Sequence, residues 1–276
     1  MITFKNKENG ILSKILLKEY PAITYSELKT LFRKKDIKIN GKRINEDVVL
    51  NGGEEIIVYN KEKSAKILYE DSNVIIVHKP FGVETTKVDK AYLASSLEEM
   101  VKGFACHRLD MNTEGIVILA KNEFIQKEMF KEFKMGNIHK FYLAYVYGIL
   151  DKKESTLNNY LIKLNDGVKV VENKEKNSVN IITKYKVVKE FENYSLVEIE
   201  LVTGKTHQIR AHFSYINHFV IGDNKYGNKD INKEFGFKKQ CLCSYKVKFT
   251  CESPVLKYLN ELDITTTPTF LKNNEM

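Results

Sequence analysis

The sequence lacks several signatures that would assign its chemistry directly. Its four cysteines form no CxxC pair and have no His-x3-His partner, which argues against a zinc site; they are Cys106, Cys241, Cys243 and Cys251. Neither the GxGxxG fingerprint of dinucleotide-binding folds nor a P-loop occurs. No apolar run approaches the roughly 18 residues of a transmembrane helix, and the first ten residues lack the apolar core of a signal peptide. We therefore expect a cytoplasmic protein with reduced thiols and with no metal, cofactor or membrane segment.

The composition favours a packed protein with an anionic partner. Hydrophobic residues make up 43% and aromatic residues 11% of the 276 positions, which is enough for a sizeable core. The net charge of +8 indicates a partner such as nucleic acid or an anionic membrane surface. Most of the excess is lysine, and the chain is also rich in asparagine and isoleucine, so a biased codon composition would give the same charge. Charge alone leaves nucleic-acid binding open.

Residues 1–60 are predicted to form a small unit of two helices followed by a curled sheet. Residues 11–20 carry an apolar helical face, which Pro21 ends. The stretch Thr24–Glu27 is a capping box that opens a second helix. Two short alternating runs then flank Asn40-Gly41, which is the strongest short signal for a hairpin.

A basic run leads from the second helix into the hairpin. Residues 28–43 hold seven basic side chains against one acid, Asp36; the seven are Lys29, Arg33, Lys34, Lys35, Lys38, Lys42 and Arg43. The apolar positions of the helix must pack inward, which leaves these cations on the outside. Such a surface suits a phosphate backbone, although a solvated charged face without a partner explains the same pattern.

Residues 67–265 are predicted to form a second, larger domain, after a polar linker at 61–66 and before a tail at 266–276. Strands predominate in this domain: strand-like runs occupy 66–82 (strand, turn, strand), 115–120, 140–150, 179–188, 194–202 and 241–250. Few helices separate the strands. We therefore expect an α+β fold in which helices pack on a large, mainly antiparallel, mixed sheet.

Helices are predicted at four places in the larger domain: a start at Ser96–Glu99, a helix over Glu123–Lys134, a helix over 205–216, and a last helix with Ser253 as cap and Pro254 at its first position. Two of these helices have apolar faces, formed by Phe124, Phe130 and Phe133 in one and by Ile209, Phe213 and Ile216 in the other. The helix over Glu123–Lys134 is expected to end at Gly136.

The stretch HRLDMNTEG at 107–115 places one carboxylate, Asp110, shortly before the apolar run GIVILA. Taken alone, an aspartate in this position is most simply a turn residue. The alternative is a catalytic carboxylate beside a buried strand. Residues elsewhere in the chain are needed to distinguish a turn residue from a catalytic carboxylate.

Four ordered segments carry a resemblance to a known family. HRLD, followed by Thr113, Gly115 and AKN, resembles the catalytic motif of the RluA family of RNA pseudouridine synthases. LYEDSNVIIVHKPFG, HKFYLAYVYG and LVTGKTHQIRAHFSYINHFVIGDNKYG are similar to three further segments of that family, in the same order. Together the segments cover most of residues 67–250.

The resemblance implies a site built from three residues. Asp110 is the implied catalytic carboxylate, Tyr142 lies over the target base, and Arg210 pairs with the aspartate. The residues agree with this: Arg210 is one step, about 100°, from Ile209 on its helix, so it borders the buried face, where a guanidinium needs a carboxylate. Arg108 would fill the space that the flipped base leaves or would hold a phosphate.

The implied reaction is the conversion of uridine to pseudouridine, an isomerisation that requires no cofactor. Asp110 would act as a nucleophile or take a sugar proton, and the target base would flip out of its stack. Three positions depart from the family pattern, and we expect them to bear on the choice of uridine: Glu114 for a common serine, Lys205 for a frequent arginine and Phe81 for a small residue.

The N-terminal unit resembles the S4 RNA-binding module over about 50 residues. The likeness implies that Arg33, Lys34, Lys35 and Lys38 contact RNA, and the hairpin residues Lys42 and Arg43 extend this surface. We expect a monomeric synthase that acts on structured RNA, with large-subunit rRNA ahead of tRNA. The alternatives are a tRNA-specific synthase of the same family, a non-catalytic RNA-binding or assembly protein, and a glycoside hydrolase, for which Glu114 is the only second acid nearby.

Overall fold

The computed structural model describes residues 2–19, 25–59, 64–86 and 96–271. The chain divides into two compact units, Met1–Ser64 with Thr86–Met100, and Ala65–Thr85 with Val101–Met276. The sequence-based boundaries place residues 86–100 in the larger domain, whereas this division groups them with the first unit. Thr24, the first residue of the predicted capping box, lies outside the described residues.

Within the first unit, the described residues of Met1–Ser64 form two helices and two small sheets. Its elements are β1 (Ile2–Lys5), β2 (Gly10–Ile11), α1 (Leu12–Glu19), α2 (Tyr25–Arg33), β3 (Ile37–Ile39), β4 (Lys42–Ile44), β5 (Val49–Leu50) and β6 (Glu55–Val58). The sheet order is β1-β6-β3-β4, with β2-β5 as a separate pair. Apolar residues of both helices and of β3 and β6 form its core, among them Leu12, Leu16, Leu28, Ile37 and Ile56.

The β3–β4 hairpin turns at the predicted position. Asn40 and Gly41 both have positive φ angles, 47° and 82°, as a two-residue hairpin turn requires. The first helix starts one residue later than predicted, because Ile11 pairs with Val49 in the β2–β5 ribbon. α3 (Leu97–Val101) starts at the predicted site: the Ser96 N–H donates to Glu99, and the Ser96 hydroxyl accepts from the Glu99 N–H.

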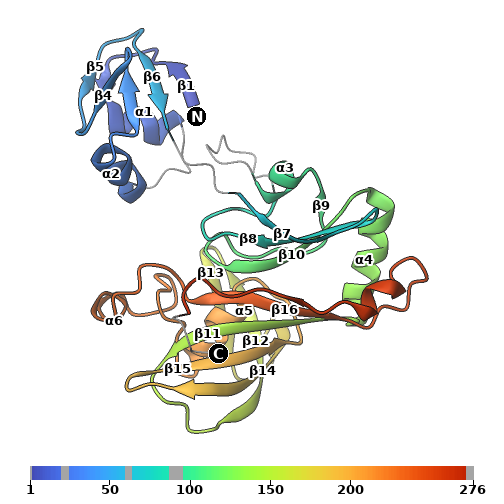
Figure 1. Cartoon of the computed structure of the whole chain (residues 1–276). Coiled ribbons are helices and arrows are strands. Elements are labelled where there is room, and N and C mark those ends of the chain that lie inside the picture. The colour runs from blue at the N-terminus through green and yellow to red at the C-terminus, as the bar shows by residue number, and fades with distance from the viewer. Residues whose placement is uncertain (1, 20–24, 60–63, 87–95, 272–276) are drawn as a thin grey trace. The chain divides into compact units, whose positions relative to one another are not determined.

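The second unit is organised around one large sheet (Figure 1). Its strands are β7 (Lys66–Glu70), β8 (Val74–Lys79), β9 (Phe104–Ala105), β10 (Glu114–Ala120), β11 (Ile138–Tyr147), β12 (Glu154–Leu164), β13 (Gly167–Val171), β14 (Val179–Glu190), β15 (Tyr194–Leu201), β16 (Leu242–Phe249) and β17 (Ile264–Thr265). The order is β13-β12-β14-β15-β11-β16-β10-β8-β7, with β9 on β10 and β17 on β16. The β10–β16 pair is parallel and the other pairs are antiparallel, so the predicted mixed, mainly antiparallel sheet is confirmed.

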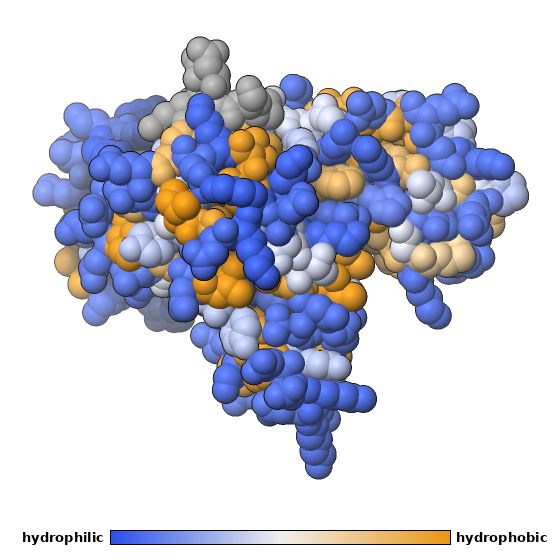
Figure 2. Space-filling view, turned by 90° about the horizontal axis from the view of Figure 1, so that it is seen from below, coloured by the Kyte–Doolittle hydropathy of each residue, from blue (hydrophilic) through white to orange (hydrophobic). Residues whose placement is uncertain are grey.

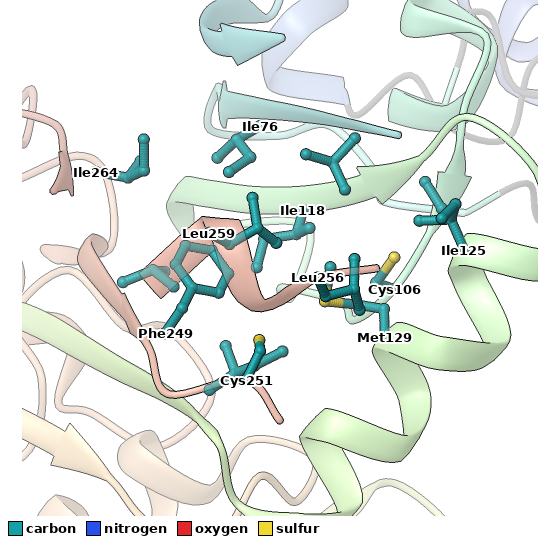
Figure 3. Close-up of a cluster of buried hydrophobic side chains, with 14 of the residues drawn as sticks. Ile76, Cys106, Ile118, Ile125, Met129, Phe249, Cys251, Leu256, Leu259 and Ile264 are labelled. Carbon is teal, nitrogen blue, oxygen red and sulfur yellow. The ribbon is translucent and has the colours of Figure 1, made fainter. Parts of the chain in front are cut away.

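Three helices pack on this sheet: α4 (Glu123–Met135), α5 (Gln208–Tyr215) and the short 3-10 helix η1 (Lys257–Glu261). A further helix, α6 (Lys229–Glu234), is held by Asn232, which bonds to Gly222 and Asp223. Figure 3 shows one core cluster, in which Ile76 and Ile118 of the sheet meet Met129 of α4 and Leu259 of η1. In place of the last helix, which is predicted to start at Ser253 and Pro254, the chain forms only the short 3-10 helix η1. The side chain of Asn260 bonds to both backbone groups of Cys251, which ties this turn to the end of β16.

The predicted apolar face of α4 is wrong for Phe124 and Phe130 and right for Phe133, which is half-buried and packs against the core cluster. Phe124 is 60% and Phe130 47% exposed, and the side that faces the core carries Ile125, Met129 and Glu132. The helix itself begins at its Asn122 cap and ends at Gly136 in the left-handed conformation, as predicted. The helix buries one stripe, which Ile125 and Met129 share with Phe133, while Phe124 and Phe130 lie outside it.

The predicted tail is ordered and packed as far as Leu271. The Thr266 N–H donates to the carbonyl of Tyr245, and its hydroxyl lies 2.8 Å from Nδ1 of His78. The buried carboxylate of Glu114 accepts the N–H and the hydroxyl of Thr269, each at 2.7 Å. Phe270 packs on the ring of Tyr145. Residues 266–271 are therefore part of the second unit.

Figure 2 shows the hydropathy of one face of the molecule. In the view of Figure 2, polar and charged residues dominate, and hydrophobic residues appear in separate patches. Among the described residues, no helix is long and apolar enough to cross a membrane.

Candidate active site

Asp110 lies in the turn between β9 and β10. Its carbonyl accepts the N–H of Thr113, and the N–H of the preceding Leu109, which is buried, donates to Thr85. The Asp110 side chain is 21% exposed. The aspartate is thus fixed by its own turn and by the loop after β8, with its carboxylate at the boundary between protein and solvent.

Gly115 allows the Asp110 turn to approach the centre of the sheet. Its φ angle is 117°, and a Cβ atom at this position would lie 2.3 Å from the carbonyl oxygen of Ser244. Only glycine fits here, and β10 can then pair with β16 through Gly115 and Ser244. On its other side, Ser244 pairs with Tyr142 of β11, where the register shifts by a bulge. The close approach at Gly115 therefore brings the Asp110 turn, at the start of β10, to one side of β16, with Tyr142 of β11 on the other side.

Arg210 of α5 bonds to two carboxylates. Its Nη1 donates to Oδ2 of Asp110 at 2.8 Å, while Nε and Nη2 donate to Oδ2 and Oδ1 of Asp223 at 2.6 and 3.0 Å. The arginine side chain is 8% exposed, more deeply buried than the border position that the helical pattern predicts. The structure brings Asp110 and Arg210 together, as the family resemblance implies.

Asp223 is a site residue that the sequence analysis missed. Burial acts to raise its pKa, but the bonds from Arg210 and from the backbone N–H groups of Lys225 and Tyr226 outweigh burial and hold the pKa below its usual value. Burial likewise acts to lower the pKa of Arg210, and the two carboxylates raise it above its usual value. One available signal was the number of donors: a buried guanidinium has five, and Asp110 alone satisfies few of them.

His207 is the second missed residue. It precedes α5 with a φ angle of 54°, in the left-handed region. Its Nδ1 lies 2.8 Å from the hydroxyl of Tyr226, and its Nε2 lies 3.7 Å from Oδ2 of Asp110. Burial lowers the pKa of His207, although Asp110 acts to raise it. The imidazole is therefore neutral at pH 7, next to the aspartate.

Tyr142 is 4% exposed and lines a cavity of about 270 Å³ together with Asp110 and Arg210. Burial raises the pKa of its hydroxyl far above the usual value, so the phenol is neutral at physiological pH. The same cavity is lined by four cationic side chains and one carboxylate; the cations are Arg108, Lys140, Lys205 and Arg210. An excess of positive charge around a neutral ring suits an anionic ligand with a flat, uncharged part.

The three positions that depart from the family pattern lie in different places. Lys205 is exposed and lines the cavity. Glu114 is buried, bonds to Thr269 and is not among the residues that line the cavity. Phe81 lies under the ammonium group of Lys239, at 5.5 Å from its ring centre. The expectation that these positions bear on the choice of uridine thus has a structural basis only for Lys205.

The basic residues of the first unit form one surface around the hairpin. Arg33, Lys34, Lys35, Lys42 and Arg43 are exposed. Lys38, half-buried, and Arg43 both lie over the ring of Tyr59, at 5.3 and 4.9 Å, and Arg43 also pairs with Asp36 at 3.8 Å. The cations are thus gathered at the end of α2 and on β3–β4.

Comparison with known proteins gives consistent matches. The model of a family described as RNA pseudouridylate synthase matches residues 73–215. A Mycoplasma capricolum protein named uncharacterized RNA pseudouridine synthase is 30% identical over 98% of both chains. Ribosomal large subunit pseudouridine synthase C of Rickettsia bellii is 29% identical over 83% of this chain and 86% of its own. The solved structure of human RNA pseudouridylate synthase domain containing 1 superimposes with a TM-score of 0.63 at 21% identity, over 77% of this chain and 86% of that one.

The chain therefore belongs to the RNA pseudouridylate synthase family, whose matched segment includes Asp110, Tyr142 and Arg210. It is an isomerase that acts on RNA. Within the family it is of the RluA type, the type of its relatives named ribosomal large subunit pseudouridine synthase.

Proposed function

We propose that this enzyme isomerises specific uridines of structured RNA, namely large-subunit rRNA, with Asp110 as its catalytic carboxylate. The observation that carries the proposal is the bond from Arg210 to Asp110 at 2.8 Å inside the cavity that Tyr142 lines. The choice of rRNA is supported by relatives in Rickettsia bellii and Haemophilus influenzae that are named ribosomal large subunit pseudouridine synthase C.

Arg210 has two effects on Asp110 in this proposal. Its positive charge favours the ionised carboxylate, which the reaction needs for attack or for removal of the sugar proton. Its two bonds to Asp223 hold the guanidinium in place, so the charge is oriented before substrate arrives. The N1–C1′ bond of uridine then breaks, the uracil turns over, and C5 bonds to C1′. C5 loses its proton and N1 gains one, so that substrate and product are isomers.

Tyr142 is proposed to stack on the flipped uracil. Its buried, neutral phenol lines the cavity, and base–aromatic stacking is worth about 1–3 kcal/mol per base. Because the cavity lies inside the second unit, a target base must leave its stack to reach Asp110. Arg108, exposed at the cavity, is the residue we propose to occupy the vacated stack or to hold a phosphate.

The first unit is proposed to bind RNA as an S4-like module. Its support is the cluster of Arg33, Lys34, Lys35 and Lys38 at the end of α2 and the start of β3, extended by Lys42 and Arg43. Charges of this kind attract phosphate backbones irrespective of sequence, and the second unit then selects the uridine.

The test is Asp110→Asn, with pseudouridine mapped across rRNA and tRNA in cells that carry only the variant. We expect one or more large-subunit rRNA sites to disappear, while Asp166→Asn, which alters an exposed carboxylate, leaves the map intact. An unchanged map in Asp110→Asn would refute the catalytic role. The loss of tRNA sites alone would make the enzyme a tRNA synthase, and RNA binding by the wild type without any conversion would favour the non-catalytic alternative.

A further inference from the structure

Lys140 is a half-buried lysine in the catalytic cavity to which the proposed mechanism gives no role. It lies on β11 two residues before Tyr142, so both side chains point to the same face of the strand. Two residues of a strand span about 7 Å, which is the scale of a nucleotide. Both side chains line the cavity that Asp110 also lines.

The surroundings of Lys140 leave its charge without an anion. Over the part of the chain that the structure describes, no carboxylate pairs with its ammonium group, and the one carboxylate that lines the cavity, Asp110, is bound to Arg210. Its neighbours are the ring of Phe133, at 5.4 Å from Nζ, and the backbone at Gly204. Burial lowers the pKa of Lys140, and no nearby acid raises it.

His107, which lies near Lys140, does not compensate the positive charge of that lysine. Burial lowers the pKa of this histidine to about 3, and the charge of Lys140 contributes to the shift. Its Nε2 accepts the N–H of Ile118 at 3.1 Å, which a neutral ring can do and a protonated ring cannot. His107 is therefore neutral, and the cation next to it remains uncompensated.

Gly204 makes room at the ammonium group. A Cβ atom at this position would lie 3.1 Å from Nζ of Lys140, so even an alanine would crowd the space beside the charge. A buried cation without a partner is costly, and such a cost is recovered when an anionic ligand binds. An RNA-modifying enzyme offers one anion of suitable size and charge, a phosphate of its substrate.

We propose that Lys140, beside Gly204, binds the phosphate of the target nucleotide while Tyr142 holds its base. The inference rests on the proposed function, because it places a nucleotide in the cavity of Asp110. Lys140 is thereby a positioning residue: it touches the substrate away from the reacting atoms and holds the sugar against Asp110. Its effect is on affinity and on placement, and the chemical step remains with Asp110.

The test compares uridine 5′-monophosphate with uridine as probes, by calorimetric titration of the whole chain at low salt. The wild type should bind the nucleotide more tightly than the nucleoside, and Lys140→Met should lose about tenfold in nucleotide affinity, as expected for one charge-assisted hydrogen bond, with no change for uridine. Lys140→Gln should behave in the same way. The matched control is Lys248→Met, which removes an exposed lysine that lies over the ring of Phe141.

Two results would overturn the inference: equal affinities of the wild type for nucleotide and nucleoside, or equal loss of nucleotide affinity in the Lys140 and Lys248 variants. Asp110→Asn separates this outcome from the proposed function, since it should abolish pseudouridine formation and keep the preference for the nucleotide. If pseudouridine persists in Asp110→Asn while Lys140→Met still loses that preference, the catalytic assignment fails and the phosphate site stands.

Discussion

Asp223→Asn should destabilise the second unit far more than the loss of a surface carboxylate would. The Asp223 side chain is 1% exposed, and its two oxygens accept four hydrogen bonds, two from Arg210 and one each from the N–H groups of Lys225 and Tyr226. Asparagine has the same shape but only one accepting oxygen. If that oxygen keeps the three bonds of Oδ1, the amide nitrogen faces the Nε–H of Arg210, and two donors meet.

The size of this destabilisation follows from the positive charge of Arg210, which stays buried after Asp223 is replaced. Removing one partner of a buried ion pair costs about 3–5 kcal/mol. Arg210 keeps its bond to Asp110, which offsets part of the loss, so we expect a decrease of about 3 kcal/mol in the free energy of unfolding at pH 7. For a unit of this size, that corresponds to a fall of roughly 6–12 °C in Tm.

Urea unfolding followed by circular dichroism measures this effect. The control is Asp166→Asn, which removes a carboxylate that is 93% exposed and pairs with Lys225 at the surface; its expected effect on stability is far smaller, because solvent screens an exposed pair. The pH dependence gives a second check. Because the pKa of Asp223 is lowered in the folded state, its contribution is present above its unfolded pKa and is lost as pH falls through the folded pKa. A decrease below about 1 kcal/mol, or one that equals the control, would refute the reasoning.

Two further predictions concern the basic surface of the first unit and the buried histidine His212. Neutralising Arg33, Lys34, Lys35 and Lys38 together should weaken RNA binding and reduce its salt dependence with little effect on the chemical step; filter binding over a salt series checks this, and an unchanged slope would exclude the first unit as the RNA-binding surface. The pKa of His212 is lowered by burial to about 4, while its unfolded value is 6.5. The unfolded chain therefore takes up the proton first, and His212 by itself should lower the free energy of unfolding by about 3 kcal/mol between pH 6.5 and pH 4, with His107 adding to the fall. Urea titrations at several pH values test this, and a flat profile over that window would contradict it.

Much of the fold could be predicted because its signals are local. The β3–β4 hairpin at Asn40-Gly41 and the caps of α4 follow from residues adjacent in sequence. The strands β12 and β13 were not predicted, because β12 is exposed along much of its length and includes Asn158 and Asn159, which favour turns. Their strand form comes from pairing with each other and with β14.

The candidate site could be predicted only in part. Asp110, Tyr142 and Arg210 lie in segments that resemble a known family, and the structure brings all three to one cavity. Asp223 and His207 carry no periodic or spacing signal of their own. Their roles depend on a guanidinium that needs a second carboxylate and on a left-handed residue before α5, and both are properties of the folded chain.

Position 114 cannot be considered separately from the end of the chain. A serine there would be too short to accept the N–H and the hydroxyl of Thr269 as Glu114 does. Exchanging Glu114 to restore the family pattern would thus require a matching change near residue 269. For the same reason, a truncation after residue 265 would leave a buried carboxylate without its donors and uncover the ring of Tyr145. Expression tags on this enzyme are better attached at residue 1, which keeps the contacts of residues 266–271 intact.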